Sequence, residues 1–393
     1  MGITARGAGL LVAAVALLGV GFRFAYPELT VLGAAAGAAL GHALLTAAWR
    51  PRLVVRRHAD PDRVARGEPA RMAVTVANTG RLRAANLVAE DRCGDRVVPV
   101  PLLRLRPGRD TRVGYDVPTG RRGVVPVGPL RVTRRDPLGL VSLTRPYGDT
   151  VPVWVYPRVH PLTAAPTGAG RSLDGRVDAV PQGSITFDSL REYVIGDELR
   201  RVHWRTSARV GELMVRENVD TSLPRIVVVL DNRAPAHPDL VDGVAESFEA
   251  ACEAAASVVT AAVRADLPVV LLLVAPDATV LPTPADDRGP TGGGPLDLLA
   301  AADLDRGDGA AGLRTATARL RQERLGDTLV FLTGPGGRAD LGLVGALRGG
   351  YRSVVVGVLG VGQPTAASAT GPLLIEAADA ARFAAEWDRI RRW

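Results

Sequence analysis

The chain has 393 residues, 47% of them hydrophobic, which is too long for a single core and too apolar for a disordered protein. Its formal net charge is +7 and all 48 of its Lys+Arg residues are arginine, yet acidic residues are interspersed with them and no long basic block occurs, which argues against a nucleic-acid-binding protein. Two cysteines, Cys93 and Cys252, are too few for a disulfide framework or a metal–thiolate cluster.

Residues 1–50 contain two long apolar stretches. Residues 7–22 carry no charge, and residues 31–49 contain no Asp, Glu, Lys or Arg. As a helix the first stretch would span about 24 Å, short against a hydrocarbon core of about 30 Å, but Arg6 and Arg23 can extend it by snorkelling. A signal peptide is the alternative, although no A-x-A cleavage site follows and a second apolar stretch comes at once. We predict a two-helix transmembrane hairpin.

Glycines and arginines add detail to this hairpin. Gly33, Gly37 and Gly41 recur every four residues, a spacing that lets two helices approach closely. The loop between the stretches has only Arg23, whereas a cluster follows the second stretch: Arg50, Arg52, Arg56 and Arg57. Since positive residues stay on the cytoplasmic side, we expect a multi-pass protein of the cell membrane, with two helices in the lipid bilayer and its soluble domains cytoplasmic.

Residues 51–160 change to the two-residue alternation of β-strands. Residues 73–77 alternate in this way, and Asn78-Thr79-Gly80 follows as a turn signal. Asp136-Pro137-Leu138-Gly139-Leu140 also predicts a tight turn. Further short strands are expected at residues 87–90, 97–100, 111–117, 124–127, 130–134 and 151–156. We predict an all-β, sandwich-like domain that packs or binds rather than catalyses.

A linker and a distinctive segment come next. Residues 161–184 are rich in Gly, Ala, Thr and Pro and are predicted to form a linker. In the segment 185–223, Gly196 permits an unusual backbone angle, and Asp197 is expected to cap a helix that runs to about Ala208. A strand is expected at residues 213–217.

The same segment contains the residue types of a hydrolytic triad, Asp197, His203 and Ser207. However, a nucleophile is usually placed on a strained turn or a strand end, and no G-x-S-x-G elbow is present. We therefore favour a structural or partner-binding role, in which arginines pair with carboxylates and stack on Trp204, and we assign no catalytic residue. The residues given this role are Arg191, Tyr193, Gly196, Asp197, Arg200, Trp204, Ser207 and Arg209.

The run R-E-Y-x-x-G-D-x-x-R-x-x-H-W-x-x-S-A-R, from Arg191 to Arg209, resembles the signature of the bacterial family called domain of unknown function 58. The upstream runs R-G-x-x-x-x-G-P and D-P-L-G-L, and the order of the predicted domains, are similar to that family as well. The resemblance implies a membrane-associated protein with a region similar to a von Willebrand factor type A domain. It also implies a MoxR-type AAA+ ATPase as a partner, and it implies no enzymatic activity.

Residues 224–393 alternate apolar strands with helices, which predicts a doubly wound α/β domain with a mostly parallel sheet covered on both faces. Strands are expected at residues 225–231, 268–275, 328–333, 353–359 and 373–376. Helices are expected at residues 239–265, 295–303, 310–323, 338–348 and 377–391. Ligands of such sheets bind at the carboxyl ends of the strands, where Asp231 lies.

Asp231 is a degenerate metal position. The von Willebrand type A pattern would place Asp-x-Ser-x-Ser here to coordinate Mg²⁺, but Arg233 and Pro235 replace both hydroxyl residues. An arginine would compete with the ion, and a hard cation needs several oxygen ligands. Thr333 and Asp340 could still contribute, but we predict no metal. The Gly-rich runs at residues 292–294 and 334–337 lack the phosphate-loop pattern and are interpreted as flexible loops, and we predict no cofactor.

These features favour a membrane-anchored, non-enzymatic adaptor or assembly protein that works with a MoxR-type AAA+ ATPase. Two other classes stay open. One is an envelope-associated hydrolase that uses Asp197, His203 and Ser207. The other is an arginine-driven binder of anionic lipid or nucleic acid, although the charge pattern favours no nucleic-acid partner.

Overall fold

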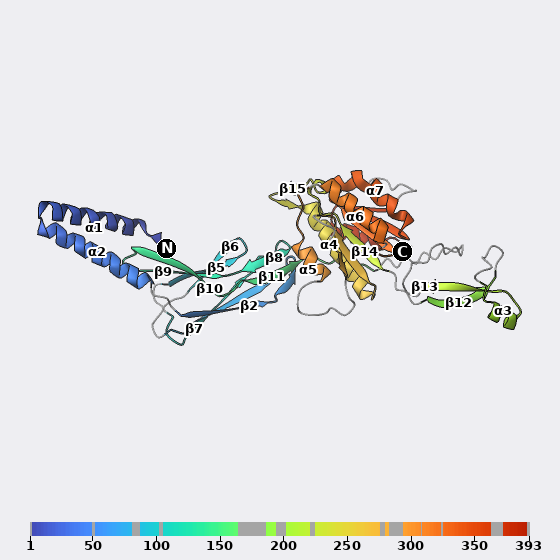
Figure 1. The fold of residues 1–393 in the computed structure, drawn as a ribbon, viewed down its shortest axis with the longest axis horizontal. Helices are drawn as coiled ribbons and strands as arrows, with labels where there is room; N and C mark the ends of the chain where they lie inside the picture. Colours follow the sequence, from blue (N-terminus) through green and yellow to red (C-terminus); the bar gives the residue numbers. More distant parts are fainter. Residues whose placement is uncertain are drawn as a thin grey trace. The chain divides into compact units, whose positions relative to one another are not determined.

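The computed structural model describes residues 2–48, 52–80, 87–101, 105–163, 186–193, 202–220, 225–275, 280–282, 294–307, 309–323, 325–362 and 372–390. The chain divides into two compact units, Met1–Pro157 and Arg158–Trp393. Figure 1 shows the elements of each unit.

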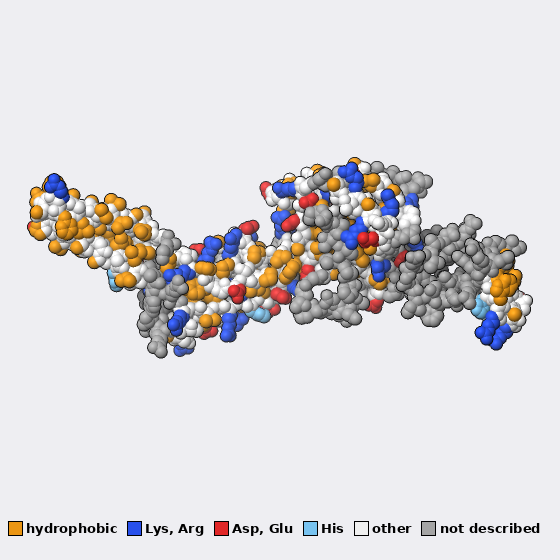
Figure 2. All heavy atoms as spheres, viewed as in Figure 1, with side chains coloured by type: hydrophobic (Ala, Val, Ile, Leu, Met, Phe, Trp, Pro, Cys, Tyr) orange, Lys and Arg blue, Asp and Glu red, His pale blue; other side chains and the backbone are white. Residues whose placement is uncertain are grey.

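Two long helices open the first unit, α1 (Ala5–Phe24) and α2 (Pro27–Ala48) (Figure 1). The Thr4 hydroxyl caps α1 by accepting a hydrogen bond from the amide of Gly7, and the helix ends at Ala25 in a left-handed conformation. Pro27 then occupies the first position of α2, where its missing N–H is not needed. By length and composition both helices are able to cross a membrane, as the predicted hairpin requires, and Figure 2 shows mostly hydrophobic side chains on the visible face of the hairpin.

The two helices approach each other at Gly21 and Gly33. A Cβ atom at Gly33 would lie 2.8 Å from the side chain of Leu18, and one at Gly21 would lie 2.6 Å from an atom of α2. No atom lies within 4 Å of the position that a Cβ would take at Gly37 or Gly41. The predicted close approach is therefore confirmed for Gly33 and wrong for Gly37 and Gly41, where a Cβ atom would meet open space.

The base of the hairpin joins the β-domain within the first unit. Strand β1 (Gly2–Ile3) pairs with β10 (Val141–Tyr147), and the Thr4 hydroxyl donates to the carbonyl of Gly139 at 2.8 Å. A small apolar cluster combines residues of α2 with the start of β10: Leu40, Ala43, Leu140 and Val141. Strand pairing and apolar packing thus attach the hairpin to the β-domain that follows it.

Two β-sheets form that domain. The smaller sheet has the order β2 (Leu53–Asp60), β4 (Arg71–Asn78), β7 (Asp110–Asp116). The larger has the order β1-β10-β9-β5-β8-β11-β3, with β6 paired to β5. Its remaining strands are β3 (Arg63–Ala65), β5 (Leu87–Cys93), β6 (Arg96–Val100), β8 (Gly123–Val127), β9 (Leu130–Arg135) and β11 (Val151–Tyr156). One core holds buried residues of both sheets, such as Met72 and Val74 from β4 and Val127 and Val153 from the other.

The predicted strands of this domain are all present, and the sequence missed β1, β2, β3 and β10. The predicted tight turn at Asp136 is confirmed, because it joins β9 to β10. The Asp136 carboxylate accepts hydrogen bonds from the amides of Leu138 at 2.9 Å and Val141 at 2.6 Å, and Gly139 has a φ of 68°. The side chain of Asp136 therefore closes its own turn.

A buried ion pair links the two sheets. Arg57 on β2 and Asp91 on β5 lie 2.9 Å apart between Nη2 and Oδ1, and their side chains are 2% and 0% exposed. The hydroxyl of Tyr115, on β7, donates to Asp91 at 2.8 Å. Burial, and then the hydrogen bond with Asp91, raise the pKa of Tyr115. This Arg57–Asp91 pair is a polar tie through an otherwise apolar core.

The second unit contains a mostly parallel sheet in the order β18-β17-β14-β19-β20-β21. Its strands are β14 (Ile226–Leu230), β17 (Val269–Leu273), β18 (Val280–Pro282), β19 (Thr328–Thr333), β20 (Ser353–Leu359) and β21 (Leu373–Ala377). Only the β17–β18 pairing among these is antiparallel. The five strands predicted here are confirmed, and β18 was missed.

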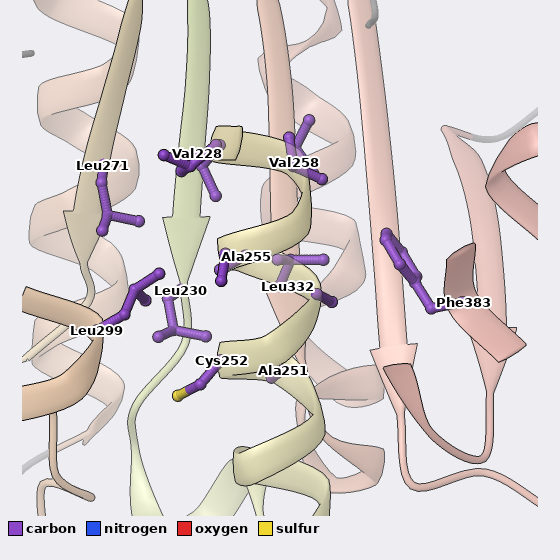
Figure 3. Close-up of a cluster of buried hydrophobic side chains, with 14 of the residues drawn as sticks. Val228, Leu230, Ala251, Cys252, Ala255, Val258, Leu271, Leu299, Leu332 and Phe383 are labelled. Atoms are coloured by element: carbon purple, nitrogen blue, oxygen red, sulfur yellow. The ribbon is translucent and has the colours of Figure 1, made fainter. Parts of the chain in front are cut away.

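Helices cover both faces of this sheet, as a doubly wound fold requires. One core contains Val228 and Leu230 of β14 together with residues of α4 (Glu246–Arg264), α5 (Pro295–Ala301) and α8 (Ala380–Asp388) (Figure 3). The other contains Val227 and Val229 with residues of α6 (Gly309–Glu323) and α7 (Leu341–Gly345). Alternate residues of one strand thus enter different cores, which is why the strand reads as a continuous apolar run.

Two predicted helices begin or end elsewhere. Residues 240–245 form a short hairpin of β15 (Leu240–Val241) and β16 (Val244–Ala245), so α4 begins only at Glu246. Asp242 and Gly243 both have positive φ values, 50° and 77°, as a two-residue Asp-Gly hairpin turn requires. The single helix predicted at 338–348 is instead divided into η3 (Pro335–Asp340), α7 and η4 (Ala346–Gly349). The first of these begins with Pro335, Gly336 and Gly337, which are poor α-helix formers.

Candidate functional site

The carboxyl edge of the α/β sheet is where strand order reverses. The chain passes from β14 to β17 on one side and later returns to β19 on the other side of β14. Doubly wound sheets bind ligands at such a switch point. Asp231 follows β14 and Thr333 ends β19, so both lie at this edge.

Four side chains meet there, and we call them the Arg233 cluster: Asp231, Arg233, Thr333 and Asp340. Arg233 forks onto Asp231, with Nε 2.7 Å from Oδ1 and Nη2 2.8 Å from Oδ2. The same Nη2 donates to Asp340 Oδ2 at 2.8 Å, and the Thr333 hydroxyl donates to Asp231 Oδ2 at 2.7 Å. The structure therefore brings together the three oxygen-bearing residues that the sequence named for a metal, around an arginine.

The guanidinium of Arg233 stays charged in this buried place. Burial on its own would lower the pKa of Arg233, but hydrogen bonds and charge from Asp231, and then from Asp340, outweigh burial and raise it. The side chains of Arg233 and Asp231 are 5% and 0% exposed. A divalent cation does not fit this arrangement, because the guanidinium lies against the oxygens that would bind it. Within the described residues no group of three or more His, Cys, Asp and Glu is suited to a metal.

Glycines allow the loops at this edge to pack closely. A Cβ atom at Gly337 would collide with the hydroxyl of Thr333, and one at Gly336 would collide with the carbonyl oxygen of Pro235. The sequence interpretation of this Gly-rich run as a flexible loop is wrong, because η3 is packed directly against the loop after β14. Close packing fixes Asp340, the last residue of η3, beside Arg233.

A second polar network, which the sequence did not reveal, adjoins the first. His237 Nε2 lies 2.7 Å from the carbonyl oxygen of Asp231, to which it donates, and Nδ1 lies 2.8 Å from the hydroxyl of Ser247. Asp239 accepts hydrogen bonds from the amide of Ser247 at 2.8 Å and from its hydroxyl. Although these are the residue types of a hydrolase, Ser247 is fully buried, so the network fixes the start of α4 rather than presenting a nucleophile.

Burial and hydrogen bonds set the charge states of this network. Burial lowers the pKa of His237. For Asp239, burial raises the pKa, but hydrogen bonds from Ser247 outweigh it and the net shift is downward. His237 and Ser247 are ten residues apart across the β15–β16 hairpin, so no helical or strand spacing could have predicted their contact.

The signature segment forms an antiparallel ribbon and a short helix. Strands β12 (Thr186–Glu192) and β13 (Met214–Asp220) pair along their length, and α3 (Trp204–Val210) precedes β13. Of the helix predicted from Asp197 to Ala208, residues 197–201 lie outside the described residues, and residues 202 and 203 are not helical, since α3 begins at Trp204. Val202 is instead bridged to Val215, and His203 caps α3 by accepting a hydrogen bond from the amide of Thr206 at 3.2 Å.

The polar side chains of α3 bond locally. The Ser207 hydroxyl donates to the carbonyl oxygen of His203 at 3.1 Å and accepts from the amide of Met214 at 2.8 Å. The ring of His203 contacts Thr206 instead, with Nδ1 2.8 Å from its hydroxyl. The contacts of Ser207 and His203 thus hold α3 against β13 and form no nucleophile–base pair.

The other predicted signature residues have different positions. Arg191 pairs with Val215 in the ribbon, and the amide of Tyr193 donates to the carbonyl of Leu213 at 2.8 Å. Three predicted residues, Gly196, Asp197 and Arg200, lie outside the described residues. Trp204 is 64% exposed, and the cation–π contact found among the described residues joins Arg23 to Phe24 rather than an arginine to Trp204.

The exposed face of α3 combines apolar and basic side chains (Figure 2). Trp204, Val210 and Leu213 are 64%, 56% and 41% exposed, and Arg205 and Arg209 on the same helix are exposed as well. We call these five residues the α3 patch. Large apolar side chains exposed together mark interaction surfaces more often than single ones do.

Comparison with known proteins gives limited likenesses. The CARDB domain of the PF1109 protein from Pyrococcus furiosus, solved in complex with di-metal ions, is 18% identical over 27% of this chain and 93% of that chain, with a TM-score of 0.21. β-Glucosidase 3B from Thermotoga neapolitana is 15% identical over 26% of this chain and only 17% of that chain, with a TM-score of 0.15. No curated protein matches the sequence. Residues 189–290 match the family described as "Protein of unknown function DUF58", which supports the resemblance carried by the signature between Arg191 and Arg209.

Proposed function

We propose that the protein is a membrane-anchored, non-enzymatic adaptor that contacts a MoxR-type AAA+ ATPase through the α3 patch. The observation that carries this proposal is that some side chains of α3 form hydrogen bonds within the segment while others are exposed to solvent. Ser207 and His203 bond inward to the backbone and to Thr206, while Trp204 is 64% exposed beside two arginines. Ser207 and His203 of the signature thus stabilise the local structure, and the exposed surface that remains is apolar and basic.

The chemistry of the patch indicates the kind of surface that it fits. Tryptophan and arginine are the residues most enriched among those that dominate protein–protein binding energies. Arg205 and Arg209 favour an acidic partner surface, and Val210 and Leu213 favour an apolar centre. The ATPase itself comes from the family resemblance. The hydrolase alternative gains no support, because the Ser207 hydroxyl contacts the carbonyl of His203 and not its ring.

The hairpin supplies the membrane anchor in this proposal. Helices α1 and α2 are each long and apolar enough to span a bilayer. A cytoplasmic location for both ends is supported by the arginines that follow α2. Arg57 has to be left out of that argument, because its buried pairing with Asp91 gives it a structural role. Arg50, Arg52 and Arg56 still outnumber the single Arg23 of the connecting loop.

We further propose that the α/β domain is of the von Willebrand factor type A kind. Two features support this. The sheet is parallel except for the edge strand β18, and an aspartate, Asp231, directly follows the first strand at the switch point. The Arg233 cluster departs from the expected metal site, so the proposed domain binds its partner without a bound cation.

Co-isolation from membranes tests the adaptor proposal. The full chain, tagged and expressed with a MoxR-type ATPase, is solubilised in detergent and purified, and the recovered ATPase is quantified. We expect Trp204→Ala to reduce recovery about tenfold, since losing one dominant contact costs about 1.4 kcal/mol or more. Val263→Ala is the control, because Val263 is similarly exposed, at 51%, on α4. Recovery of no AAA+ ATPase by the wild type would reject the proposal, as would equal recovery by both variants.

A further inference from the structure

The carboxyl edge of the α/β sheet gathers oxygen atoms of the kind that bind hard cations. Both carboxylate oxygens of Asp231, the hydroxyl of Thr333 and a carboxylate oxygen of Asp340 converge there. Asp231 and Thr333 are fully buried, and the Asp340 side chain is 33% exposed. Mg²⁺ and Ca²⁺ bind such oxygens. A buried carboxylate is very costly unless a positive charge accompanies it.

Arg233 provides that positive charge. Its Nε and Nη2 atoms lie 2.7 Å and 2.8 Å from the two oxygens of Asp231, and Nη2 also lies 2.8 Å from Asp340. The planar fork of a guanidinium suits this two-point contact, which a lysine could not make. One cation therefore serves two carboxylates, as a metal ion would.

The backbone holds the arginine side chain in this position. The amide of Arg233 donates to Asp231 Oδ1 at 3.2 Å, so the chain turns back on itself after Asp231. The next amide, of Ala234, donates to the carbonyl of Asp305 at 2.8 Å, and the amide of Asp305 donates to the carbonyl of Asn232 at 2.8 Å. The loop after β14 is thus fixed on both sides of Arg233.

We propose that the Arg233 guanidinium is a built-in replacement for a divalent cation at this edge of the sheet. The wild-type domain accordingly needs no metal for its stability. The oxygens of Asp231, Thr333 and Asp340 form a latent divalent-cation site, which opens when residue 233 loses its charged side chain. The partly exposed Asp340 gives an ion a route to this site from solvent. This inference concerns the α/β domain and does not depend on the adaptor proposal.

Metal titration of arginine variants tests the inference. The full chain is purified in detergent, and its thermal unfolding is followed with EDTA or with millimolar Mn²⁺, while bound Mn²⁺ is measured by electron paramagnetic resonance. We expect the wild type to bind no Mn²⁺ and to unfold at the same temperature in EDTA and in Mn²⁺. Arg233→Ser should unfold at a lower temperature in EDTA, bind about one Mn²⁺, and recover about 5 °C or more when Mn²⁺ is present.

Two further variants provide matched controls. Arg233→Lys keeps a positive charge and should bind no Mn²⁺, and the double variant Arg233→Ser/Asp231→Asn should lose the binding gained by Arg233→Ser. The inference is overturned if the wild type binds Mn²⁺ through Asp231, or if folded Arg233→Ser binds none. If Arg233→Ser does not fold in EDTA, refolding in Mn²⁺ decides: recovery supports the latent site and failure contradicts it.

Discussion

Two buried arginine–aspartate pairs, one in each unit, use the same chemistry for different ends. Arg57 and Asp91 are 34 residues apart in sequence and connect the two sheets of the β-domain. Arg233 and Asp231 are two residues apart and lie on one loop at a sheet edge. The first pair is a long-range tie that depends on the sheets being assembled. The second pair is local, and the guanidinium of Arg233 also binds Asp340, the last residue of η3.

The difference lies in what each arginine replaces. In the β-domain the pair occupies a place that apolar side chains could fill, since buried ion pairs are often no more stabilising than well-packed hydrophobic residues. At the sheet edge, apolar side chains could not replace Arg233, because the oxygen atoms around it are of the kind that bind a cation. Buried arginines therefore carry functional information only when the groups around them are known.

Breaking the tie between the sheets should have the largest effect. Arg57→Ala would leave Asp91 charged and buried, which costs about 3–5 kcal/mol in the free energy of unfolding. This cost is measured by urea denaturation of the full chain in detergent, with a probe that reports the unfolding of the first unit. Arg71→Ala is the control, because Arg71 and Asp116 form an exposed pair, 80% and 79% exposed, and its loss should cost less than about 1 kcal/mol. Equal costs for the two variants would mean that burial does not distinguish them.

A smaller effect is expected near the Arg233 cluster. Ser247→Ala removes the hydroxyl that contacts both His237 and Asp239 at the start of α4, and should cost about 1–3 kcal/mol because it leaves buried polar groups without their partner. This loss of stability is measured by urea denaturation of the full chain, with a probe that reports the unfolding of the second unit. Thr315→Ala, at an exposed threonine on α6 that bonds only within its own helix, should be nearly neutral. A neutral Ser247→Ala would show that the network does not hold the loop.

The same network should make the second unit sensitive to acid. Burial lowers the pKa of His237, so below about pH 6.5 the unfolded chain takes up a proton that the folded chain does not, and stability falls as the pH falls. The lowered pKa of Asp239 acts in the same direction at more acidic pH, since its stabilisation is present above its unfolded pKa and is lost below its folded one. His237→Gln should flatten the dependence of unfolding free energy on pH between about 7.5 and 5.5. An unchanged slope would exclude His237 as its source.

The exposed arginine-rich face of α3 should contribute least to stability. Trp204→Ala removes a side chain that is 64% exposed, so the free energy of unfolding should change by less than about 0.5 kcal/mol. Circular dichroism during thermal unfolding of the full chain checks this. A large loss of stability would mean that Trp204 packs within the protein and that the α3 patch is not a free surface.

The sequence predicted the elements whose burial pattern is local. The strands of the α/β sheet were found because every residue of β14 and β17 is buried, which gives continuous apolar runs. Strand β2 was missed because its arginines were attributed to the membrane boundary, whereas one of them, Arg57, is buried against Asp91. Strand β10 was missed because Pro146 lies within it.

The candidate site was only partly predictable. The position of Asp231 was predicted from the rule that ligands gather at the carboxyl ends of strands, and Thr333 and Asp340 were named as residues that could contribute to a metal site there. The role of Arg233 as the resident cation depends on its rotamer and on contact with Asp340, 107 residues away, which no spacing reveals. His203 looked helical by spacing, but its ring competes for backbone amides and caps α3 instead.

Photo-crosslinking in intact cells tests the adaptor proposal most directly. A photoreactive residue is placed at position 204 of the full chain, and in a separate variant at position 263 as the similarly exposed control. The proposal predicts a covalent product with a MoxR-type AAA+ ATPase from position 204 and none from position 263. If position 204 gives no product with such an ATPase while the chain is folded and in the membrane, the α3 patch is not the surface that binds it.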